Sequence, residues 1–254
     1  MKRGLVLSGG GVRGMAHIGV LKALEEMNIG FDCIAGTSAG SIVGALYAAG
    51  HKPDKIFQLV KNLSIFNALR PAFTWTGLLT MNGLKDVLLK NIPDNDFSKL
   101  KLPLTVAATN IRNGQVQYFN SGELISTVMA SCSIPAIFNP MQIDQNLYVD
   151  GGLLDNLPAK AIRNQCDMLV GSHCNHISAD FDVTNIKLVI ERSLLIAINS
   201  NVQVSKQLCD VWIDPPGMDR YSSMDLSKGQ EIFEYGYRFV KENFTAQQFQ
   251  QIAA

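Results

Sequence analysis

Residues 4–40 read "GLVLSGGGVRGMAHIGVLKALEEMNIGFDCIAGTSAG", and the spacing of their apolar residues changes twice. An apolar run at 4–8 ends in glycines, apolar residues then recur at helical spacing through Leu24, and a second apolar run follows at 31–35. A short apolar run that ends in glycine and continues as a helix is typical of the strand-to-helix turns of α/β proteins. This stretch therefore predicts two parallel strands joined by a helix, which is the repeating unit of an α/β fold.

The rest of the chain continues this alternation of strand and helix patterns. Further strands are expected at residues 102–109, 115–120, 146–150, 167–173 and 210–214. Helices are expected at residues 38–49, 122–130, 186–208 and 228–243, and over most of 53–92, where an apolar stretch at 66–79 interrupts them. A chain of 254 residues suffices for one large α/β domain, and no linker, repeat or low-complexity tract divides it. We therefore expect a single domain over residues 1–254.

The composition narrows the classes of function and location. The chain has 22 Lys and Arg against 22 Asp and Glu, so it lacks the basic field that attracts nucleic acid, and no nucleic-acid partner is expected. Its five cysteines are odd in number and scattered, which indicates a reducing compartment and a cytoplasmic location. Apolar runs are shorter than the roughly 18 residues of a membrane span, and glycines interrupt the N-terminal run before a signal peptide could form.

The first motif is "GGGVRG" at residues 9–14, which satisfies the pattern G-x-G-x-x-G. A dinucleotide site would also need an acidic residue at the end of the second strand, where this chain has alanine and glycine. A phosphate-binding Walker loop would need lysine where Met15 stands. All such loops direct backbone amides and a helix N-terminus toward one point, where they favour negative charge such as an oxyanion. The alternative is that these glycines form only a tight turn.

The second motif places Ser38 between two glycines, Gly36 and Gly40, at the turn from the second strand into a helix. Small neighbours allow a sharp turn that exposes the serine hydroxyl, as a nucleophile requires. The alternative is a serine that caps the helix N-terminus, but such a cap does not need glycine on both sides. The pattern therefore favours a nucleophile.

A serine nucleophile needs a base, and the sequence offers two kinds. Asp150, in "DGG" at 150–152, follows a strand, although this motif alone is also an ordinary turn. His173 and His176 also follow a strand, and the chain order Ser38, Asp150, His173 matches the order in α/β-hydrolases, whose nucleophile follows several strands rather than two. His173, Cys174 and His176 are also candidate zinc ligands, but no fourth ligand for a tetrahedral zinc site is evident in the sequence.

Together the three motifs resemble the patatin-like phospholipase family, in which a serine and an aspartate form a catalytic dyad without a histidine. The stretches "ASCSIPAIFNP" and "YVDGGLLDNLPAKAI" also look like members of this family. The resemblance implies a three-layer α/β/α sandwich with a mostly parallel central sheet and the nucleophile elbow after the second strand. It further implies that Ser38 is the nucleophile and Asp150 the base, with the amides of Gly9, Gly10 and Gly11 as the oxyanion hole. The loops that support these groups are implied to contain Arg13, Gly14, Gly36, Gly40, Gly151 and Gly152.

The resemblance implies an acyl lipid, such as a phospholipid or lysophospholipid, as substrate, with no cofactor and no metal. It is compatible with transient peripheral contact with a membrane. For residues 66–79 three alternatives stay open, namely a lid, a membrane-contacting surface and a buried cap. It predicts no oligomeric state. Two positions depart from the family pattern, namely Asn110, where the family often has aspartate, and the histidine-containing run "GSHCNH" at 171–176. A Ser-His-Asp esterase and a non-catalytic lipid-binding protein on the same scaffold therefore stay open as alternatives.

Overall fold

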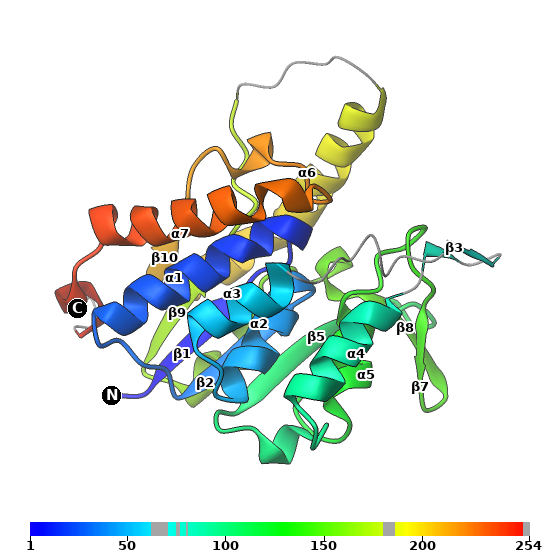
Figure 1. Cartoon of the computed structure of the whole chain (residues 1–254), viewed down its shortest axis with the longest axis horizontal. Coiled ribbons are helices and arrows are strands. Elements are labelled where there is room, and N and C mark those ends of the chain that lie inside the picture. Colours follow the sequence, from blue (N-terminus) through cyan, green and yellow to red (C-terminus); the bar gives the residue numbers. More distant parts are fainter. Residues whose placement is uncertain (62–70, 75–76, 80, 180–185, 251–254) are drawn as a thin grey trace.

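The computed structural model describes residues 1–61, 71–74, 77–79, 81–179 and 186–250. Within these residues, eight strands form one central sheet in the order β10-β9-β1-β2-β5-β8-β7, with β6 paired to β5 (Figure 1). These strands are β1 (Arg3–Leu7), β2 (Cys33–Thr37), β5 (Leu104–Asn110), β6 (Gln115–Phe119), β7 (Met141–Ile143), β8 (Asn146–Asp150), β9 (Met168–Ser172) and β10 (Val211–Ile213). The pairs from β10 through β5 are parallel, whereas β6, β7 and β8 pair antiparallel. The mostly parallel sheet is therefore confirmed.

Helices cover both faces of this sheet. They are α1 (Met15–Glu26), α2 (Ala39–Ala48), α3 (Pro53–Lys61), α4 (Asn82–Asn91), α5 (Leu124–Ser131), α6 (Ile186–Gln207) and α7 (Gly229–Asn243). Figure 1 shows α1 lying along α7 in front of the sheet. Because side chains alternate along a strand, Leu5 and Leu7 of β1 enter the larger core with α1 and α7, whereas Val6 enters a smaller core with Val202 of α6. The two cores lie on opposite faces of the sheet, each between the sheet and the helices that cover it, so helices, sheet and helices form the expected three layers.

Strand β5 brings the ends of two other strands together. Thr37, the last residue of β2, pairs with Ala107, and Asp150, the last residue of β8, pairs with Ala108. Strand β6 pairs with residues 106–110 of β5, and this range includes residues that also pair with β2 and with β8. Because β6 occupies one edge of β5 there, β2 and β8 both lie on the other edge. They run in opposite directions along that edge and meet end to end. Ser38, which follows β2, is thereby placed beside Asp150.

The structure differs from the expected elements mainly at their boundaries. Strand β2 begins at Cys33 rather than residue 31, because the Asp32 carboxylate accepts a hydrogen bond from the Arg3 amide at 2.7 Å and holds a loop there. Strand β7 was not expected. Within the stretch 66–79, β3 (Pro71–Thr74) pairs antiparallel with β4 (Gly77–Leu79). Residues 66–70 and 75–76 lie outside the described residues.

Candidate active site

Ser38 lies on a strained turn between β2 and α2. Its backbone has φ 51° and ψ −124°, a conformation that costs a non-glycine residue on the order of 1–3 kcal/mol. Ser38 occupies the N-cap position of α2, but its side chain makes no capping hydrogen bond. A Cβ atom at Gly36 would lie 2.6 Å from the carbonyl oxygen of Gly40, so the turn can close only because Gly36 lacks a side chain. This geometry leaves the Ser38 hydroxyl unused by the helix.

Two neighbouring serines hold this strained backbone in place. The Ser38 amide donates to the Ser131 hydroxyl at 2.8 Å, and that hydroxyl donates to the carbonyl of Ala107 at 2.6 Å. The Ser41 hydroxyl donates to the Ser38 carbonyl at 2.7 Å. The turn is thus tied both to β5 and to the first turn of α2. No sequence pattern marks Ser131, because both of its partners are backbone atoms distant in the chain.

Asp150 is buried next to Ser38 at the end of β8. Its Oδ1 atom accepts a hydrogen bond from the Gly152 amide at 2.8 Å. Burial raises the pKa of Asp150 from 3.8 to about 6, although hydrogen bonds from the Ser38 hydroxyl and the Gly152 amide act in the opposite direction. The structure therefore brings a serine hydroxyl and a carboxylate of increased basicity into contact.

The glycine loop passes close to Ser38. A Cβ atom at Gly9 would lie 3.1 Å from the Ser38 Cβ, and Gly11 lines the same pocket as Ser38. The Gly9 amide donates to the Asn156 carbonyl at 3.1 Å, so it is already used within the protein. Within the described part of the chain, the amides of Gly10 and Gly11 have no hydrogen-bond acceptor. These two amides, rather than all three, are available to an anion.

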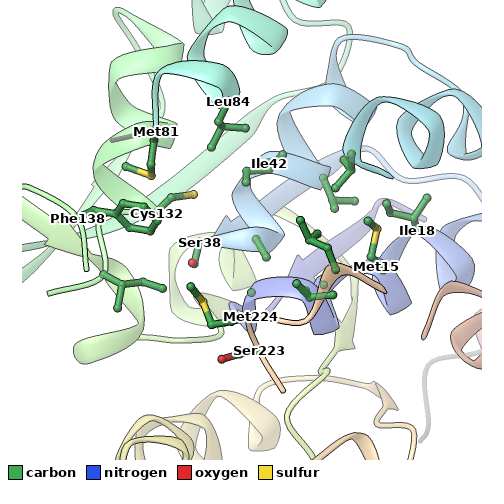
Figure 2. A pocket seen from close by; sticks show the side chains of 18 residues that line it. Met15, Ile18, Ser38, Ile42, Met81, Leu84, Cys132, Phe138, Ser223 and Met224 are labelled. Atoms are coloured by element: carbon green, nitrogen blue, oxygen red, sulfur yellow. The ribbon is translucent and has the colours of Figure 1, made fainter. Parts of the chain in front are cut away.

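An apolar pocket opens around Ser38. It is lined by side chains from α1, α2, α3, α4 and the loops around residues 134–138 and 223–226. Figure 2 shows the Ser38 hydroxyl among Phe138, Cys132 and Met224, with Met15 and Ile18 lining the pocket further along. Such a lining favours a hydrocarbon chain over a charged group.

A family profile described as "Patatin-like phospholipase" matches residues 5–162, which include Ser38, Asp150 and the glycine loop. The chain belongs to the patatin-like phospholipase family. It is 28% identical to "Lysophospholipase NTE1" of Meyerozyma guilliermondii over 275 aligned residues, which cover 96% of this chain and 19% of that protein. It is 35% identical to an uncharacterized NTE family protein of Mycobacterium tuberculosis over 161 residues, which cover 62% of this chain and 44% of that protein.

This patatin-like chain thus spans less than half the length of these curated relatives. Its fold is similar to the crystal structure of VipD from Legionella pneumophila, with a TM-score of 0.63 and 16% sequence identity. That match covers 99% of this chain and 67% of the other. At this identity the likeness concerns the fold alone.

The histidines of this patatin-like chain have other partners. His173 Nδ1 lies 2.9 Å from the Asp214 carboxylate, its Nε2 lies 3.1 Å from the Asn199 Oδ1, and its ring stacks on Trp212. His176 Nδ1 lies 3.1 Å from the same carboxylate of Asp214. Both ring nitrogens of His173 therefore have partners other than Ser38. Among the described residues, no three His, Cys, Asp or Glu side chains form a group that could hold a metal ion.

Arg13, within the glycine loop, and His17, in the first turn of α1, are both buried. Arg13 donates to the Tyr221 carbonyl at 2.8 Å and to the Asn175 Oδ1 at 3.1 Å, so it anchors the loop to distant segments. His17 Nε2 donates to the Ser8 carbonyl at 2.9 Å, and burial lowers the pKa of His17 to about 4. His17 is therefore a neutral residue that holds the start of the loop.

Proposed function

We propose that this chain is a serine hydrolase that cleaves carboxylic esters of lipids, with Ser38 as nucleophile and Asp150 as base. The observation that supports it best is the contact between a serine on a strained elbow and a buried carboxylate, at the wall of an apolar pocket. The family to which the chain belongs and the lysophospholipase named among its relatives support the same class of reaction. Because His173 bonds elsewhere, the geometry favours the dyad over a Ser-His-Asp triad.

In the proposed reaction the Ser38 Oγ attacks the ester carbonyl carbon while Asp150 accepts the hydroxyl proton. The negative charge moves to the carbonyl oxygen, where the amides of Gly10 and Gly11 stabilise it. The intermediate collapses to an acyl-serine, and Asp150 returns the proton to the departing alcohol. Asp150 then takes a proton from water, whose oxygen attacks the acyl-serine. As the bond to Ser38 breaks, Asp150 returns this proton to the Ser38 Oγ, which releases the fatty acid and restores the serine and the ionised carboxylate.

An acyl lipid is the substrate class that fits the pocket. Aliphatic, methionine and phenylalanine side chains dominate its walls, and a hydrocarbon chain gains free energy by leaving water for such surroundings. Transient contact with a membrane surface would supply this substrate. Among the described residues, no helix has both the length and the hydrophobicity that crossing a membrane requires.

The deciding experiment combines ester hydrolysis with covalent labelling. We expect the wild-type protein to hydrolyse a medium-chain chromogenic ester and to form one adduct with a fluorophosphonate, located at Ser38 by peptide mass spectrometry. Ser38→Ala should abolish the adduct and lower kcat by about 10⁴-fold or more, as loss of a serine nucleophile does in other hydrolases.

Two further results would contradict the proposed function or its dyad. A folded wild-type protein that neither hydrolyses esters of any chain length nor reacts with the phosphonate would favour a non-catalytic lipid-binding protein. His173→Ala should retain far more activity than Ser38→Ala, and a loss as deep as that of Ser38→Ala would point to a triad.

The pH dependence tests the role of Asp150. Only the ionised carboxylate can accept the Ser38 proton, and its pKa is raised to about 6. We therefore expect kcat/KM to increase with pH, with a midpoint near 6, and to reach a plateau above about pH 7. Initial rates from pH 4.5 to 8.5 measure this, with the folded fraction followed in parallel by circular dichroism. A rate that stays constant from pH 5 to 7 would argue against Asp150 as the base.

A further inference from the structure

The peptide group between Gly9 and Gly10 is held from one side by Asn175. The Asn175 Nδ2 donates to the Gly9 carbonyl oxygen at 2.5 Å, and the thiol of Cys174 lies 3.5 Å from the same oxygen. A trans peptide group is planar, and its C=O and N–H bonds point in opposite directions. The hydrogen bond from Asn175 therefore directs the Gly10 N–H to the side of the loop facing away from Asn175.

We propose that Asn175 is the positioning residue of the oxyanion loop, because its side chain sets the direction of the Gly10 amide. This inference rests on the proposed function, in which that amide stabilises the oxyanion. The Gly9 amide cannot take this part, since it donates to Asn156. Asn175 itself does not contact the reacting atoms in this proposal and acts through the loop.

The side chain of Asn175 is itself fixed in orientation. Its Oδ1 accepts a hydrogen bond from the Arg13 guanidinium at 3.1 Å, and arginine can only donate, so the Nδ2 must face Gly9. The Asn175 carbonyl accepts a hydrogen bond from the Asn199 Nδ2 at 2.6 Å, and the Asn199 Oδ1 faces His173. Asn175 is only 2% exposed. Arg13 and Asn199 thus hold Asn175 in place.

The loop also packs directly against this residue. A Cβ atom at Gly10 would lie 2.5 Å from the Cys174 Sγ and 2.9 Å from the Asn175 Oδ1. An oxyanion hole is effective because its donors are oriented before the charge develops, and a donor that must reorient loses part of its contribution. Loss of the Asn175 hydrogen bond should therefore slow the chemical step more than it weakens substrate binding.

Two variants at this position test the proposal. Asn175→Ala removes both hydrogen bonds of the side chain, whereas Asn175→Asp keeps its size and the acceptor for Arg13 but removes the donor to Gly9. For both we expect kcat to decrease by about 10- to 100-fold, less than the loss of a whole oxyanion donor, with KM within about threefold of wild type. The midpoint near pH 6 in kcat/KM should not move, because the partners of Asp150 are unchanged.

The same substitutions at Asn110 provide the matched control. Asn110 is also a buried asparagine, but it lies in β5 and its Oδ1 accepts a hydrogen bond from the nearby Arg112 amide at 2.9 Å. Asn110→Ala and Asn110→Asp should leave kcat within about twofold of wild type. A loss of kcat in these controls equal to that at position 175 would mean that any disturbed buried asparagine slows the enzyme, and would overturn the proposal.

Each remaining outcome is also decisive. If the wild-type protein is active and both Asn175 variants retain its kcat, the proposal is wrong while the proposed function stands. A decrease in Asn175→Asp alone would reveal an effect of the added charge, and an increase in KM alone would reveal a role in binding. Either would overturn the proposal. If Asn175→Ala does not fold, Asn175→Ser, which is neutral and lacks the amide donor to Gly9, takes its place and is compared with Asn110→Ser. A wild-type protein without activity or phosphonate labelling would instead reject the proposed function.

Discussion

Asp150→Asn is expected to increase the stability of the protein while it removes ester hydrolysis. At pH 8 the carboxyl group is ionised in both the folded and the unfolded chain, and burial of this charge raises its pKa from 3.8 to about 6. At 1.36 kcal/mol per pKa unit, the ionised group costs the folded state roughly 3 kcal/mol relative to a neutral one. Asparagine is neutral and similar in shape, and its oxygen can still accept from the Gly152 amide. Without a base, kcat should decrease by at least about 10³-fold.

The sign of this effect depends on pH. The pKa of Asp150 is higher in the folded state, so the folded wild-type protein binds the proton more tightly than the unfolded chain does. The gain in stability from Asp150→Asn should therefore shrink as pH falls below 6 and disappear below 3.8. Urea unfolding at pH 8 and at pH 5 measures the difference. Asp86→Asn, at an exposed position of α4, is the control and should change the free energy of unfolding by less than about 0.5 kcal/mol. A variant no more stable than wild type at pH 8 would contradict the cost assigned to the buried carboxylate.

Gly40→Ala is expected to destabilise the fold strongly. A Cβ atom at this position would overlap the backbone carbonyl oxygens of Leu7 and Ser8, because α2 packs directly on the end of β1. Backbone atoms inside a sheet cannot move aside as a flexible side chain can, so the free energy of unfolding should decrease by about 3 kcal/mol or more. Urea unfolding measures this, together with the soluble yield of the variant.

Gly30→Ala is the matched control, since a Cβ atom there would meet no heavy atom within 4 Å. Alanine restricts the unfolded chain more than glycine does, so this variant should be as stable as wild type or more stable by about 0.4–1 kcal/mol. If Gly40→Ala were as stable as Gly30→Ala, the close packing of α2 on β1 would not be needed for folding.

The expected fold agrees with the structure because its signals are local. The apolar run of β1, the glycines after it and the helical spacing of α1 lie within about twenty residues of one another, and each is set by burial and turn geometry alone. The short strand β7 carries no such signal, since its sequence Met-Gln-Ile has a polar residue at its centre and is followed by the polar Asp144 and Gln145. Strand ends also depend on partners, as Asp32 shows through its bond to the Arg3 amide.

The candidate site could be predicted only in part. The glycines around Ser38 reveal a sharp turn from sequence, whereas the functions of Ser131, Asn156 and Asn175 depend on backbone partners distant in the chain. Asparagine and serine are common in loops, so no local pattern distinguishes these three residues from others of their type. The run "GSHCNH" is unusual in the sequence because of its histidines, whereas the inference proposed above concerns Asn175, which lies between them and donates to the Gly9 carbonyl.

The meeting of β2 and β8 on one edge of β5 has a consequence for how the protein matures. The pairs Thr37 with Ala107 and Ala108 with Asp150 join segments that are far apart in the chain, and such non-local pairings form slowly. A newly made chain in which only β1, α1 and β2 have assembled has neither the Asp150 carboxylate beside Ser38 nor the Ser131 hydroxyl that accepts from the Ser38 amide. Under the proposed function, hydrolytic activity would therefore arise only when the sheet is nearly complete, and an intermediate that lacks the β5–β8 pairing would be inactive.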